Sequence, residues 1–163
     1  MARLPPMPPP PLLDCYAVTA PGVAPITARE LEALGLGPGE AEPGGVPFRA
    51  PLAGLRAANL HLRTASRVLV RLGEFHASAF YQLEQRARKL PWAAFLRAGD
   101  TVAFRVTSRK SKLYHQRGIA ERLAGAVLEA VPEVSVDTAK AAEDEADGAE
   151  PGAAAPGSRQ LFV

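Results

Sequence analysis

The sequence is poor in cysteine: its single cysteine, Cys15, excludes an internal disulfide and a metal site built from cysteines. It also lacks an uninterrupted apolar stretch of the ~20 residues that a membrane-spanning helix needs, so we expect a soluble protein. Six prolines between positions 5 and 11 interrupt the apolar N-terminal segment. Because a signal peptide needs a continuous helical segment there, we expect a cytoplasmic rather than a secreted protein. Cys15 lies in an apolar, strand-like run and is predicted to be an inert packing residue.

Patterns for catalysis and cofactor binding are missing as well. The glycines at 35–39 are not followed by Lys-Ser/Thr, and Pro38 prevents a helix from starting there. The histidines share no i, i+4 spacing with one another or with the cysteine, so no metal site is expected. Spacing indicates no Ser/His/Asp arrangement, and paired carboxylates occur only in an acidic stretch. The sequence therefore predicts no catalytic residue and no cofactor site in this chain.

Charge is divided unevenly along the chain, although the net charge is only +2. Residues 14–131 hold 16 Lys/Arg against 10 Asp/Glu, whereas residues 132–157 hold one basic residue against seven acidic ones. A basic body of this kind can attract a polyanion, which the acidic stretch would repel.

The first half of the chain alternates strand and helix signals. After a Pro-rich tail at 1–13, predicted to be disordered, strands are expected at 15–19, 46–49 and 68–72 and helices at 26–34 and 51–64. Thr27 and Glu30 fit a capping box at the start of the first helix. This β-α-β-α-β order predicts a small ferredoxin-like α/β domain at 14–77.

The second half, residues 78–163, reads as another α/β unit. A basic helix at 80–90 and a helical turn at 91–96 precede a strand at 101–107, in which Val102, Phe104 and Val106 share one face. An amphipathic helix follows at 118–131. Residues 139–158 are predicted to form a disordered acidic insertion, after which the chain resumes as the opening of a strand. Trp92 and Phe95 are expected in the core.

The main functional candidate is the run 105–117, which carries five positive charges, several hydroxyls and no acid. It spans a strand end, a loop and a helix start, where free backbone N–H groups favour phosphate. Arg and Lys would supply salt-sensitive contacts to an RNA backbone, and unpaired bases could stack on aromatic side chains. On composition alone, an ordinary solvated loop explains the run equally well. A second basic cluster, at 86–89, is also explained by solubility.

The residues at 99–113, followed by Arg117 and the sequence Ile-Ala-Glu-Arg-Leu, resemble the core of a THUMP domain. The segments 16–22, 30–34, 44–48 and 60–68 are similar to the ferredoxin-like domain that precedes the THUMP domain in class I methyltransferases acting on guanine N2 of ribosomal RNA or tRNA. The resemblance implies an α/β (α+β) fold with a ferredoxin-like domain followed by a C-terminally incomplete THUMP domain.

The resemblance also implies that the two domains capture structured RNA, while a separate Rossmann-like domain binds S-adenosylmethionine and performs the chemistry. No such domain and no Asn-Pro-Pro-Tyr type motif is present here. The family's basic strand-loop-helix edge falls on Arg105, Ser108, Arg109, Lys110, Lys112 and Arg117. Secondary contacts are expected at Arg86, Lys89, Tyr114 and His115.

Two other functions remain open at this stage. The chain could be an interaction piece whose open sheet edge pairs with a separate methyltransferase subunit by strand addition. It could also be a fragment of a split gene.

Overall fold

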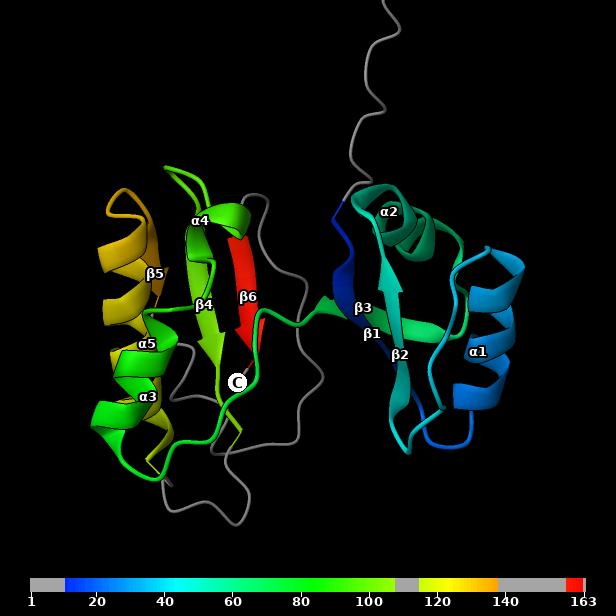
Figure 1. The fold of residues 1–163 in the computed structure, drawn as a ribbon, viewed down its shortest axis with the longest axis horizontal. Coiled ribbons are helices and arrows are strands. Elements are labelled where there is room, and N and C mark those ends of the chain that lie inside the picture. Colours follow the sequence, from blue (N-terminus) through cyan, green and yellow to red (C-terminus); the bar gives the residue numbers. More distant parts are fainter. Residues whose placement is uncertain (1–10, 108–114, 138–157, 163) are drawn as a thin grey trace, which may run out of the picture. The chain divides into compact units, whose positions relative to one another are not determined.

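The computed structural model describes residues 11–107, 115–137 and 158–162, the last of these by backbone alone. The chain divides into two compact units, the first ending at Leu72 and the second beginning at Gly73 (Figure 1). Most of the predicted Pro-rich tail and of the acidic insertion lies outside the described residues. No helix in the described ranges is long and apolar enough to cross a membrane.

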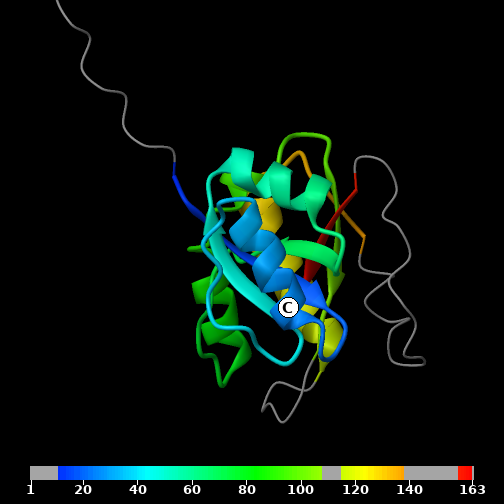
Figure 2. The same ribbon diagram turned by 90° about the vertical axis from the view of Figure 1, so that its right-hand side faces the viewer.

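The first unit has the predicted β-α-β-α-β order, which is confirmed. Its elements are β1 Leu13–Thr19, α1 Ala24–Ala33, β2 Gly45–Ala50, α2 Leu52–His61 and β3 Ala65–Val70. β1 is the central strand and pairs antiparallel with β2 on one side and β3 on the other. Both helices lie on the same face of this sheet (Figures 1 and 2).

Burial along β1 alternates, as expected for a strand with one packed face. Cys15, Ala17 and Thr19 are buried, and the residues between them are half-buried. Leu31 of α1 is fully buried against this face. Leu52 of α2 is 54% exposed, because the helix packs on the sheet through Ala58.

The start of α1 differs from the prediction, and the capping box is wrong. The helix begins at Ala24, with Pro25 in its first turn and no side-chain cap. Proline suits this position because its fixed φ fits a helix and its missing N–H is not needed there. Thr27 therefore lies inside the helix, fully buried, and its hydroxyl is 2.7 Å from that of Thr64.

Glu30 makes a contact between helix and loop in place of the predicted cap. Its carboxylate accepts hydrogen bonds from the backbone N–H groups of Arg63 and Thr64, at 3.1 and 3.2 Å, and from the Thr64 hydroxyl at 2.8 Å. Partial burial raises the pKa of Glu30, but these hydrogen bonds outweigh that effect and the net pKa is lowered. The α2–β3 connection is thereby fastened to α1.

The second unit contains a parallel sheet. Its elements are α3 Phe80–Ala87, α4 Trp92–Phe95, β4 Thr101–Arg105, α5 Gln116–Ala130, β5 Ser135–Asp137 and β6 Ser158–Phe162. β4 lies between β5 and β6 and is parallel to both. α3 packs along α5 (Figure 1). The strand expected near the C-terminus is therefore present as β6.

The core of this unit is centred on β4. Val102, Phe104 and Val106 are buried as predicted, but Ala103 between them is buried too. Strict alternation fails here because the central strand of a parallel sheet is buried on both faces. Trp92 is also in the core, as predicted: it is only 4% exposed, and its indole N–H donates to the Ala87 carbonyl at 2.8 Å.

Candidate nucleic-acid interface

The end of β4 and the start of α5 form one edge of the second unit. β4, α5 and β5 make a β-α-β crossover in which β4 and β5 are parallel. In such a unit the carboxyl end of the first strand and the N-terminus of the following helix lie at the same sheet edge, where α/β proteins bind ligands. Arg105 ends the strand and His115 is the N-cap of the helix. The structure thus brings both predicted side chains to this edge.

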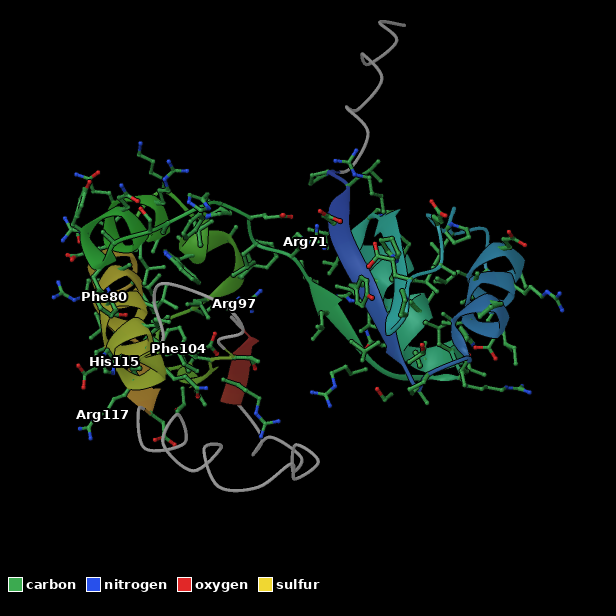
Figure 3. The ribbon with its side chains drawn as sticks, turned by 90° about the horizontal axis from the view of Figure 1, so that it is seen from below. Arg71, Phe80, Arg97, Phe104, His115 and Arg117 are labelled. Carbon is green, nitrogen blue, oxygen red and sulfur yellow. The ribbon has the colours of Figure 1, made fainter. Side chains whose placement is uncertain are left out.

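The first turn of α5 is electrostatically favourable to an anion. It contains no acidic residue, no side chain caps it, and Arg117 lies within it. Arg117 pairs with Glu121 at 3.1 Å, yet both side chains are well exposed. Such exposed pairs are weak, so the guanidinium can exchange this partner for a phosphate. Figure 3 shows Arg117 pointing outward from the helix start.

Packing holds this helix start in place. The Phe80 ring at the start of α3 lies against the first turn of α5, 3.4 Å from where a Cβ on Gly118 would be. The apolar stripe predicted for α5 is buried at Ile119, Leu123 and Val127, but Leu128, which the same pattern placed on it, is 40% exposed. Figure 3 shows Phe80 and Phe104 in the same unit as His115. The edge is therefore carried by rigid elements on both sides of the loop.

The loop itself lies outside the described residues. This applies to five of the predicted RNA contacts: Ser108, Arg109, Lys110, Lys112 and Tyr114. Of the predicted main RNA contacts, Arg105 is half-buried and Arg117 is exposed. Of the predicted secondary contacts, His115, Arg86 and Lys89 are exposed.

The basic cluster on α3 divides into two roles. Arg88 binds Glu84 at 2.8 Å and Glu129 of α5 at 3.1 Å, and Arg122 of α5 also binds Glu84, at 2.9 Å. Hydrogen bonding to Arg122, and then to Arg88, lowers the pKa of Glu84. These ion pairs join α3 to α5 and leave Arg88 little free charge.

Arg86 and Lys89 are exposed and form no ion pair with a described residue. They, rather than Arg88, are the basic residues at the C-terminal end of α3 that remain available to an anion. Among aromatic side chains of the unit, Trp92 is unavailable for stacking because it is buried, whereas Tyr81 on α3 is 62% exposed. The role of Arg122 was not predicted from the sequence, because its position on the helix does not indicate which residue of another helix it contacts.

Titratable groups elsewhere indicate no reactive site in the part of the chain that the structure describes. Burial, together with the charge of Asp14, raises the pKa of the Cys15 thiol to about 11. The raised pKa keeps the thiol protonated at neutral pH, and its burial in the core of the first unit confirms the predicted packing position. No group of three or more metal-binding side chains occurs among the described residues.

Two family models match the chain in succession. Residues 14–69 match the RlmL ferredoxin-like domain and residues 77–142 match the THUMP domain. THUMP is an RNA-binding domain. The two matches follow the division between the units at Leu72 and Gly73.

Curated relatives carry the name ribosomal RNA large subunit methyltransferase K/L. The protein from Syntrophotalea carbinolica is 36% identical over 70% of this chain, and that from Methylococcus capsulatus is 28% identical over 71%. In both cases the matched region is 16% of the relative, so the chain spans only a small part of these proteins.

Solved structures give the same picture. A predicted N6-adenine-specific DNA methylase from Listeria monocytogenes superposes with a TM-score of 0.73 at 27% identity, covering 94% of this chain and 37% of that one. SMU.472, a putative methyltransferase complexed with SAH, gives 0.66 at 32% identity, covering 72% and 31%. TrmN from Thermus thermophilus gives 0.56 at 27% identity, covering 77% and 38%.

The predicted family and fold are therefore confirmed: the chain consists of an RlmL-type ferredoxin-like domain followed by a THUMP domain, as found in THUMP-containing RNA methyltransferases.

Proposed function

We propose that this chain binds structured ribosomal RNA or tRNA and docks it for a guanine-N2 methyltransferase domain. The observation that carries the proposal is the acid-free basic run 105–117, which joins the carboxyl end of β4 to the N-terminus of α5 within a THUMP domain. Arg105, Ser108, Arg109, Lys110, Lys112 and Arg117 make the main contacts, and Arg86, Lys89, Tyr114 and His115 make secondary ones.

The physical argument rests on the helix start. Free backbone N–H groups at the first turn of α5 carry partial positive charge, and the flanking Arg and Lys residues add full charges. A phosphate at this edge meets both, and each neutralised phosphate releases counterions from the RNA. These contacts read no base, so the site holds the RNA in position rather than selecting its sequence.

S-adenosylmethionine belongs, in this proposal, to the methyltransferase domain and not to these two units. The β4–α5 connection at 106–115 contains no glycine, whereas a nucleotide-type cofactor needs glycines there for close backbone approach. The catalytic domain is either part of the same polypeptide or a separate subunit, and it acts in the cytoplasm.

The test is RNA binding as a function of salt. A triple Arg109→Ala, Lys110→Ala, Lys112→Ala variant should bind an RNA hairpin more weakly, and its slope of log affinity against log salt should fall by about one unit per lost phosphate contact. Fluorescence anisotropy between low and moderate salt measures both quantities.

The matched control removes three exposed arginines from the first unit: Arg29→Ala, Arg56→Ala and Arg63→Ala. It has the same net charge as the test variant. An equal loss of salt slope in both variants would therefore mean that overall charge, and not the loop, causes the effect. An unchanged slope in the test variant would remove the loop from the RNA site.

A further inference from the structure

The sheet of the first unit has one face that its own helices do not cover. α1 and α2 both lie on the other side (Figures 1 and 2), and the buried residues of β1 point toward them. Side chains alternate along a strand, so Asp14, Tyr16 and Val18 point to the uncovered side, together with their neighbours on β2 and β3. We call this side the open sheet face.

An aromatic ring lies in the middle of the open sheet face. Tyr16 is opposite Pro47 of β2 and Leu69 of β3, which makes an apolar row across all three strands. Its ring lies over Gly45: a Cβ there would be 2.6 Å from Tyr16 Cε1, so the ring occupies space that only glycine leaves open. The hydroxyl donates to the Glu42 carboxylate at 3.3 Å. The ring is thus fixed against the sheet and half-buried.

Arginines lie on both sides of this apolar row. Arg67 is opposite Val18 at one end; at the other end Arg49 is opposite Asp14, whose carbonyl accepts the Arg71 N–H. Figure 3 shows Arg71 on the side of β1 away from α1. Asp14 and Glu42 are carboxylates beside the row, and strand register together with the Arg71 N–H bond places Arg49, Arg67 and Arg71 at its two ends.

The spacing suits a polyanion with repeated charges. Arg67 lies on β3 and Arg71 follows the end of that strand, four residues further along, which is roughly 13 Å of extended chain at 3.3 Å per residue. One phosphate cannot contact both, but successive phosphates of an extended strand can. A fixed aromatic ring between cationic side chains on a flat sheet is the arrangement that binds unpaired bases by stacking and their backbone by charge.

We propose that the open sheet face binds a single-stranded segment of RNA, with one base stacked on Tyr16 and phosphates on Arg67 and on Arg71 or Arg49. The inference rests on the proposed function, because it assigns a second contact for the same RNA. Guanidinium groups on both sides of one fixed aromatic ring match the phosphates and bases of a single strand, so we commit to RNA as the occupant.

The experiment compares two RNA probes on the 163-residue chain. One is a hairpin with a short single-stranded 3′ extension that contains 2-aminopurine, and the other is the same hairpin with a blunt end. Tyr16→Ala should weaken binding of the extended hairpin about tenfold, within the range for loss of one stacked base, and should leave the blunt hairpin unchanged. Tyr16→Phe, which keeps the ring, should retain the affinity and the 2-aminopurine quenching.

Arg67→Ala should lower the salt slope for the extended hairpin by about 0.7, the value for one phosphate of a single strand. The matched control is Arg56→Ala, an exposed arginine on α2 on the helix-covered side, which should change neither probe. Thermal unfolding checks that each variant folds, and the expected loss of salt slope in Arg67→Ala keeps the proposal testable if Tyr16→Ala does not fold.

Replacement of Tyr16 by a photoreactive benzoylphenylalanine identifies the occupant directly. Cross-linking to the RNA extension supports the proposal; cross-linking to the second unit or to another copy of the chain overturns it. Equal affinity of Tyr16→Ala and the unaltered chain for the extended hairpin, or an equal loss for both hairpins, also overturns it. If the loop variant at Arg109, Lys110 and Lys112 still loses salt slope in that case, the proposed function stands and only the open sheet face is excluded.

Discussion

In the described residues each unit has a three-stranded sheet, and the central strand is the first of the three in sequence. The two sheets differ in whether that strand is antiparallel or parallel to its neighbours. In the first unit β1 is antiparallel to its neighbours and its residues alternate between buried and half-buried. In the second unit β4 is parallel to its neighbours, and Val102, Ala103 and Phe104 are buried in succession. An antiparallel sheet can leave one face exposed, whereas a parallel sheet is buried on both faces.

This difference indicates where each unit can bind a ligand. A sheet with one uncovered face can use that face, as we infer for Tyr16. A sheet buried on both faces has only its edges and its strand ends, and the carboxyl end of a parallel strand is next to a helix N-terminus. The proposed RNA contacts at the β4–α5 connection follow from that geometry.

The largest effect on stability is expected from truncating one large buried side chain in the core of each unit separately. Phe104→Ala should destabilise the second unit by about 3–5 kcal/mol, because the ring is fully buried and its loss leaves a cavity. Trp92, the single tryptophan, reports on this unit alone, so denaturant unfolding followed by its fluorescence measures the change.

The counterpart is Leu31→Ala in the first unit, where a loss of about 2–5 kcal/mol is expected. It should appear in far-UV circular dichroism without shifting the Trp92 transition. Leu60→Ala, at a residue 77% exposed, serves as the control with little effect. A Trp92 transition that moves equally with Leu31→Ala would mean that the two units unfold together, which contradicts the comparison.

An intermediate effect is expected at the helix–loop contact of the first unit. Thr64→Val removes the hydroxyl that donates to Glu30 and is hydrogen-bonded to the Thr27 hydroxyl. The substitution should lower the free energy of unfolding by about 1–2 kcal/mol. Circular dichroism in urea measures it. A loss of stability below a few tenths of a kcal/mol would show that the backbone N–H donors alone hold the Glu30 carboxylate.

The same contact predicts a pH dependence. The pKa of Glu30 is lower in the folded chain than in the unfolded one, so the stability it contributes is present above its unfolded value of about 4.3 and is lost as pH falls through the folded value. Glu30→Gln should therefore reduce the acid-induced loss of stability. Glu32→Gln, at an exposed neighbour on the same helix, should leave that loss unchanged.

The smallest effect is expected from the ion pairs between α3 and α5. Glu84→Gln removes the shared partner of Arg88 and Arg122. Because both arginines are exposed and Glu84 is only half-buried, we expect a shift in the Trp92 transition that is detectable only at low salt. Glu121→Gln breaks a comparable exposed pair and provides the control. A large shift that persists at high salt would show that these pairs are structural supports of the second unit.

Much of the fold was predictable because helices and strands in both units follow local periodicity. The β-α-β-α-β order of the first unit and the burial of Ile119, Leu123 and Val127 in the second follow from apolar spacing. The capping box failed because the helix begins at Ala24, two residues before the predicted start at 26, and pattern alone does not rank the proline signal against the capping signal. Burial of Ala103 was missed because strand direction is a property of the whole sheet.

The candidate site was predicted in part, for a related reason. Charge and helix position identified Arg105, His115 and Arg117 as neighbours, and the topology brings them to one edge. The partners of Arg88 were not predictable because Glu129 lies 41 residues away, on another helix. The open sheet face escaped notice because Tyr16, Arg67 and Arg71 become neighbours only through strand register.

The position of β6 has a consequence for synthesis on the ribosome. The first unit is complete in sequence once Val70 has been made, so it can fold while the rest of the chain is still being translated. β4 cannot complete its pairing until β6 has been made, because Thr101 of β4 pairs with Ser158 of β6, 57 residues later in the chain. Such distant pairing forms slowly. The second unit therefore spends longer with one side of its central strand unpaired, and substitutions there should reduce the yield of folded protein more than equal losses of stability in the first unit.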